Sequence, residues 1–135
     1  MMESIEKLSK SVVFKLFEHL ENKDQSFSKL FTNDAIFLSA YEKKLGINDL
    51  IADFICKSSV FSDIHYRINQ VITEGNTVVI DYNWTGTQKA EYLGVASRGN
   101  HVDVRYTDTF LVEYGQIKKW RCLFNWASMK KQMIK

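Results

Sequence analysis

The segment from His101 to Glu113 alternates between apolar and polar residues almost without interruption. Even-numbered positions from Val102 to Val112 are apolar apart from Asp108, and odd-numbered positions are mostly polar. A period of two over this length is typical of a β-strand that turns one face to the protein interior. We therefore expect the carboxylate of Asp108 to point into an apolar core.

A buried carboxylate needs compensation, because an unpaired charge in an apolar interior costs several kcal/mol or more. Asp108 must therefore be paired, hydrated in a cavity, or protonated. Arg67, Arg105 and Arg121 are the candidate ion-pair partners, although Arg105 lies on the opposite face of the same strand. In an apolar pocket a neutral Asp108 could instead donate a hydrogen bond to a carbonyl or enolate oxygen. Asp108 is thus the candidate catalytic residue, with a structural ion pair as the alternative.

The order of predicted elements favours an α+β fold. Apolar residues at three- and four-residue steps predict a first helix from Ser4, its N-cap, to about residues 21–24. A short helix and a short strand should follow, then a helix capped by Asn48. The predicted strands cover 65–74, 77–88, 101–113 and 116–126, and the chain should end in a short helix. We expect one domain over 1–135, in which N-terminal helices pack on a curved antiparallel sheet.

Three further expectations concern where side chains lie. The inner side of the third helix should carry Leu50, Ile51, Phe54 and Ile55. The first long strand should turn Tyr66, Ile68, Gln70 and Ile72 to one face. Cys56 and Cys122 are expected to be small buried residues, and a disulfide between them stays an open alternative.

Composition and motifs exclude several functions. A formal net charge of +2 gives no electrostatic argument for nucleic acid. The sequence shows no phosphate-binding glycine loop, nucleophile elbow or metal-ligand spacing, so we expect neither a cofactor nor a metal. Neither a membrane span nor an apolar leader is evident, which predicts a cytoplasmic protein.

Polar groups among aromatic residues mark the inner face of the two central strands. Tyr82, Trp84, Gln88, Tyr106 and Asp108 should face the same space. Such a set suits a pocket for a small, largely apolar molecule with one or two oxygens, although tyrosines and tryptophans in a sheet also serve as core. Trp120 and Asn125 on the last strand would both reach this pocket only if a bulge intervenes.

Short motifs across the chain resemble the SnoaL-like polyketide (ester) cyclases, which belong to the nuclear transport factor two-like superfamily. The similar segments are Thr85-Gly86-Thr87-Gln88, Glu91 with Gly94, Arg98-Gly99, and Gly115-Gln116-Ile117 through Trp120 to Asn125. The resemblance implies a cone-shaped sheet wrapped by helices around a deep pocket. It also implies a homodimer formed through the outer face of the sheet.

The catalytic residues of these relatives are only partly present. The aspartate that ends the closing strand of the cyclases is Asn125 here, and the histidine of their Gly-Thr-His turn is Gln88. Residues 107–110, Thr-Asp-Thr-Phe, resemble ketosteroid isomerase, in which the aspartate matching Asp108 is a protonated oxyanion-hole donor. Its general base would fall at about Ser39, and its tyrosine near Leu16 or Phe17.

These residues and resemblances leave three candidate functions. The first is an isomerase- or cyclase-like enzyme for a small hydrophobic carbonyl compound, with Asp108 as acid or oxyanion donor and with Tyr82, Trp84, Gln88, Tyr106, Trp120 and Asn125 as ligand-binding residues. The second is a protein that binds such a molecule without turnover, because amides at 88 and 125 hydrogen-bond but do not titrate. The third is a dimeric interaction module with Val79, Leu111 and Leu123 on its outer sheet face.

Overall fold

The computed structural model describes residues 2–39 and 43–135. Its helices are α1 (Met2–Glu21), the 3₁₀ helix η1 (Gln25–Leu30), α2 (Ile47–Val60) and α3 (Trp126–Ile134). Its strands are β1 (Phe31–Leu38), β2 (Lys44–Leu45), β3 (Phe61–Glu74), β4 (Thr77–Gln88), β5 (His101–Glu113) and β6 (Gln116–Phe124). The predicted α+β fold is confirmed, with β3 starting four residues earlier than expected.

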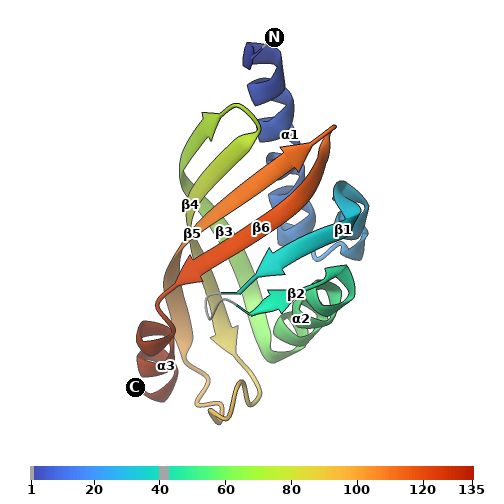
Figure 1. Cartoon of the computed structure of the whole chain (residues 1–135). Coiled ribbons are helices and arrows are strands. Elements are labelled where there is room, and N and C mark those ends of the chain that lie inside the picture. The colour runs from blue at the N-terminus through green and yellow to red at the C-terminus, as the bar shows by residue number, and fades with distance from the viewer. Residues whose placement is uncertain (1, 40–42) are drawn as a thin grey trace.

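The strands form one six-stranded sheet in the order β2-β1-β6-β5-β4-β3. Neighbours are antiparallel except for the parallel pair β1 and β6. The long strands curve across the molecule, and α1 and α2 lie against them while α3 packs beside β5 (Figure 1). The helices α1 and α2, the helix η1 and the inner face of the sheet therefore enclose the core.

Residues of α1 make contact with this core over only part of the helix. Val12, Val13, Leu16 and Phe17 are buried, whereas Ile5 and Leu8 of the predicted stripe are exposed. The first turns of α1 reach the turn between β3 and β4, where the carboxylate of Glu6 accepts a hydrogen bond from the backbone of Gly75. They run beside a turn rather than over the sheet, so their apolar side chains stay uncovered.

Strand β3 contains a bulge that the alternation pattern does not reveal. Ile68 pairs with Tyr82, but Gln70 pairs with Asp81, which leaves one extra residue in β3. A one-residue insertion reverses the faces of the residues that follow it. The prediction that Gln70 and Ile72 share a face with Tyr66 and Ile68 was wrong, because the bulge turns them to the other face, where both are exposed.

Three smaller expectations also need correction. The helix α1 already includes Ser4, so Ser4 is not its cap. The N-cap of α2 is Gly46, whose backbone N–H donates to the side chain of Asp49, and Asn48 lies inside the helix. Cys56 is exposed rather than buried, and both cysteines are free thiols.

Among the described residues, none of the helices combines the length and the hydropathy needed to cross a membrane.

Candidate functional site

A small cavity lies between the helices and the inner face of the sheet. Its volume is about 60 Å³. A water molecule needs roughly 10–15 Å³ of such space, so the cavity holds a few waters, and a larger ligand requires side chains or helices to move. The lining residues are mostly aromatic or aliphatic: Leu20, Lys23, Phe27, Phe37, Leu50, Asp53, Phe54, Lys57, Ser58, Ile64, Tyr66, Tyr82, Trp84, Tyr106, Trp120 and Cys122.

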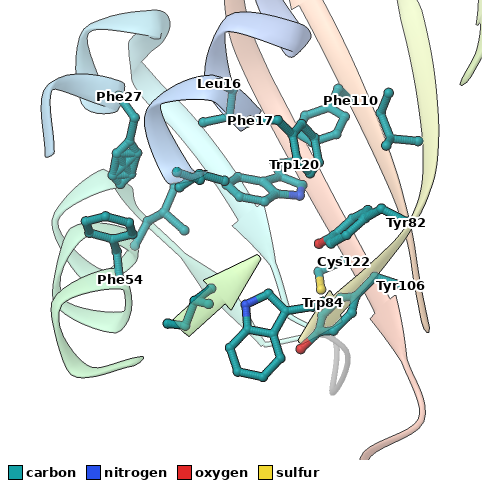
Figure 2. Packing of buried hydrophobic residues seen from close by; sticks show 14 of the residues in the cluster. Leu16, Phe17, Phe27, Phe54, Tyr82, Trp84, Tyr106, Phe110, Trp120 and Cys122 are labelled. Atoms are coloured by element: carbon teal, nitrogen blue, oxygen red, sulfur yellow. The ribbon is translucent and has the colours of Figure 1, made fainter. Parts of the chain in front are cut away.

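The wall on the sheet side comes from alternate residues of β4, β5 and β6. Tyr82 of β4 is directly opposite Tyr106 of β5, and the two rings are stacked with centroids 5.2 Å apart. Trp84, Trp120 and Cys122 complete this wall. Figure 2 shows the hydroxyls of Tyr82 and Tyr106 directed to the same side. Period-two alternation therefore places the aromatic side chains where the sequence predicted them.

Asp108 lies behind this wall rather than in it. Its side chain has no solvent exposure. The Tyr82 hydroxyl and the Trp120 indole N–H both donate to its Oδ2 atom, each at 2.8 Å. Its Oδ1 atom is buried and accepts no hydrogen bond from any described residue. Both donors line the cavity, and Asp108 does not. The aspartate is therefore linked to the cavity through neighbours that line it, namely Tyr82, Trp120 and Cys122.

The environment of Asp108 makes its neutral form accessible. Burial raises the pKa of Asp108 to about 6, against the opposing effect of hydrogen bonds from Trp120, Tyr82 and Cys122. Burial also raises the pKa values of Tyr82, Tyr106 and Cys122. These neighbours are therefore neutral donors near pH 7 and not counter-charges.

The arginines proposed as partners of Asp108 lie elsewhere. Arg105 pairs with Asp81 on the outer face, and Arg67 and Arg121 are exposed. Within residues 2–39 and 43–135, no cation forms an ion pair with Asp108. The ion-pair alternative is therefore wrong for this carboxylate.

Gln88 and Asn125 lie outside the cavity lining. Gln88 is fully buried, and its Nε2 atom donates to the backbone oxygens of Ala90 at 3.0 Å and Val95 at 2.8 Å. This amide therefore holds the loop after β4. Asn125 follows β6 and caps α3, where its Oδ1 accepts a hydrogen bond from the backbone of Ser128 at 3.1 Å.

Helix α2 contributes two charged lining residues that the apolar pattern of the sequence did not reveal. The Lys57 ammonium lies 3.3 Å from the Asp53 carboxylate, one turn earlier in the helix. Lys57 continues the buried stripe of Leu50 and Phe54 at a three-residue step, which was the available signal. The expected inner residue Ile55 is instead exposed, so the helix is rotated relative to the prediction.

Lys57 keeps its charge despite its position. Burial acts to lower its pKa, but the acidic groups around it, including Tyr106 and Asp53, raise the pKa of Lys57 well above its usual value. In the part of the chain that the structure describes, no three His, Cys, Asp or Glu side chains gather in a way that could hold a metal ion.

Comparison with known proteins gives a family and a fold. A family model described as SnoaL-like polyketide cyclase matches residues 15–133. A structure from Jannaschia sp. CCS1, assigned as a SnoaL-like polyketide cyclase, is 22% identical with a TM-score of 0.86, covering 96% of this chain and 93% of that one. IdmH from Streptomyces antibioticus, assigned as a polyketide cyclase, is 15% identical with a TM-score of 0.83, covering 94% and 99%.

A third structure extends the likeness to a related fold. A protein from Catenulispora acidiphila with a ketosteroid isomerase-like fold, in complex with trimethylamine, is 13% identical. Its TM-score is 0.75, covering 90% of this chain and 91% of that chain. No curated protein matches the chain at a significant level. At these identities the structures show the shared fold, and the matched family model shows that the chain belongs to the SnoaL-like polyketide cyclase family.

Proposed function

We propose that this protein binds a small, largely apolar carbonyl compound and polarises its carbonyl oxygen with the hydroxyl of Tyr82. The observation that carries the proposal is the arrangement in which Tyr82 and Trp120 line the cavity and both donate to Asp108 behind it. Apolar walls with a few convergent polar groups are the usual composition of a small-molecule site.

Whether the Tyr82 hydroxyl can donate to a ligand depends on the protonation of Asp108. With Asp108 ionised, the single hydroxyl proton of Tyr82 is donated to Oδ2 and no proton remains for a ligand. A proton on Oδ2 reverses this bond, so that Asp108 donates to the Tyr82 oxygen. The Tyr82 proton is then free for a carbonyl or enolate oxygen in the cavity, where a donor fixed in an apolar site is most effective. Asp108 thus acts as a positioning residue through Tyr82.

Turnover would also need a group that removes a proton next to the carbonyl. Asp53 is the one carboxylate among the described lining residues, and its side chain is 40% exposed beside Lys57. The related structures assigned as polyketide cyclases suggest substrates of the polyketide type for such chemistry. If turnover occurs here, Asp53 is our candidate base, in place of the aspartate that Asn125 replaces. Binding without turnover remains the alternative function.

Dimer formation and cytoplasmic location stay predictions. Leu123 on the outer sheet face is 56% exposed, whereas Val79 and Leu111 are half-buried. Sedimentation analysis of the purified protein would test the predicted homodimer.

Binding of acetophenone, a small aromatic ketone, tests the proposed function by ligand-observed NMR titration. Tyr82→Phe removes the proposed donor and should weaken binding by about tenfold, as expected for one buried hydrogen bond. Tyr114→Phe is the matched control, because this tyrosine is 96% exposed in the turn between β5 and β6. Equal affinities for wild type and Tyr82→Phe would contradict the proposal.

The same titration has an expected pH dependence. Because the competent form carries a proton on Asp108, affinity should fall above about pH 6, by at most about tenfold per pH unit. Asp108→Asn carries an amide that does not titrate in this range, whichever of its oxygen and nitrogen atoms faces Tyr82. This variant should therefore show an affinity that does not change between about pH 5 and 8.

A further inference from the structure

The cavity has an apolar wall on the sheet side and a charged wall on the helix side. Its described lining residues include the cations Lys23 and Lys57 and the single anion Asp53. The charged lining therefore carries an excess of positive charge. Asp108 does not offset this excess at the surface of the cavity, because it lies behind Tyr82 and Trp120.

The charge of Lys57 lies over the sheet wall rather than out in solvent. Its side chain is only 25% exposed. Burial raises the pKa values of Tyr66, Tyr106 and Cys122, and the positive charge of Lys57 opposes that rise in each. These three residues line the same cavity as Lys57, on β3, β5 and β6, so the ammonium and the sheet wall border the same space.

Lys57 is suited to binding an anion and not to attacking a carbonyl. Its raised pKa keeps the amine protonated near pH 7, and a protonated amine is not a nucleophile. Its present partner, Asp53, is more exposed than Lys57 itself, at 40% against 25%. The ammonium has three N–H donors, so a ligand carboxylate can bind it beside Asp53.

We propose that the ligand of this cavity carries a carboxylate that binds Lys57 on the α2 side, while its carbonyl oxygen binds Tyr82 on the sheet side. This inference rests on the proposed function and narrows its ligand class to keto acids. The flat side chains of Phe54, Tyr66 and Trp84, which also line the cavity, favour a planar ring between the two groups.

Three probes with the same ring test this ligand class by ligand-observed NMR at about pH 5.5, where Asp108 is mostly protonated. Acetophenone has the carbonyl alone, 4-acetylbenzoate adds a carboxylate at the opposite end, and 4-acetylbenzamide is its neutral analogue. We expect 4-acetylbenzoate to bind on the order of tenfold more tightly than the amide, which is the size of one charge-assisted hydrogen bond. High salt should reduce this preference.

Variants of Lys57 test whether its charge causes the preference for 4-acetylbenzoate over 4-acetylbenzamide. Lys57→Met keeps the apolar stem and should abolish the preference for the acid, whereas Lys57→Arg should retain it. Lys130→Met removes an exposed charge on α3 and should behave like wild type.

The possible outcomes separate this inference from the proposed function. Equal binding of acid and amide, with binding still dependent on Tyr82, would overturn the inference and leave the function standing. An acid preference that survives Lys57→Met would also overturn it. Binding of none of the three probes would overturn both.

Discussion

The two faces of strands β4 and β5 shift the pKa values of their aspartates in opposite directions. On the outer face, Asp81 of β4 accepts hydrogen bonds from Arg105 of β5, and these bonds lower its pKa. On the inner face, Asp108 has only neutral donors, and burial raises its pKa to about 6. One strand pair therefore holds a stably ionised aspartate on its outer face and a readily protonated aspartate in the core. The inner residue is the one whose charge state a ligand can change.

The largest expected difference between the two faces is the loss of stability when a side chain is truncated. Phe110 is fully buried on the inner face, where its ring lies 5.2 Å from Trp120 and 6.0 Å from Phe17. Phe110→Ala should lower the free energy of unfolding by about 3–5 kcal/mol, because it removes apolar contacts and leaves a cavity. Thr109→Ala on the exposed face should cost about 0.5 kcal/mol or less. Urea denaturation of both variants measures the difference, and similar losses would contradict the assignment of faces.

A second contrast is the direction in which stability depends on pH. Asp108 ionises with a pKa of 3.8 in the unfolded chain and about 6 in the folded protein. Between about pH 4 and 6 the folded state therefore binds more protons, so stability falls as the pH rises, by about 3 kcal/mol in total, and then levels off. Below about pH 4, protonation of Asp81 on the outer face acts in the opposite direction, because its folded pKa is lowered.

Asp108→Asn isolates this contribution. Urea midpoints of wild type and variant should be measured from about pH 4 to 7.5, and the difference between the two proteins cancels the titration of histidines and outer carboxylates. The variant should lack the decline between about pH 4 and 6 that wild type shows. Parallel curves would mean that Asp108 has the same pKa folded and unfolded.

The sequence predicted the strand faces well because alternation depends only on local spacing. The burial of Asp108 and the inward positions of Tyr82, Trp84 and Tyr106 are confirmed on this basis. The family resemblance is confirmed as well. These successes concern strands β4 and β5, whose pairing with each other runs without a register shift.

Features that depend on tertiary structure escaped prediction. No residue type in the sequence marks the bulge after Ile68. Gln70 and Ile72 were therefore assigned to the wrong face. Asp53 and Lys57 are charged, so the apolar pattern of the helix did not include them, although they line the cavity. The positions of Gln88 and Asn125 depend on a loop and a helix cap that follow the strands.

The smallest expected effect concerns the ion pair on the outer face. Arg105 is 71% exposed, and its Nε atom donates to Asp81 Oδ1 at 3.0 Å. Arg105→Ala should lower the free energy of unfolding far less than Phe110→Ala does, since exposed pairs gain little over hydrated charges, and about 1 M salt should reduce the loss. Arg67→Ala is the control, because this exposed arginine on β3 forms no ion pair with any described residue. A salt-insensitive loss as large as that of Phe110→Ala would show that the outer face is not solvated as the structure has it, and would favour burial of that face against a second copy of the chain.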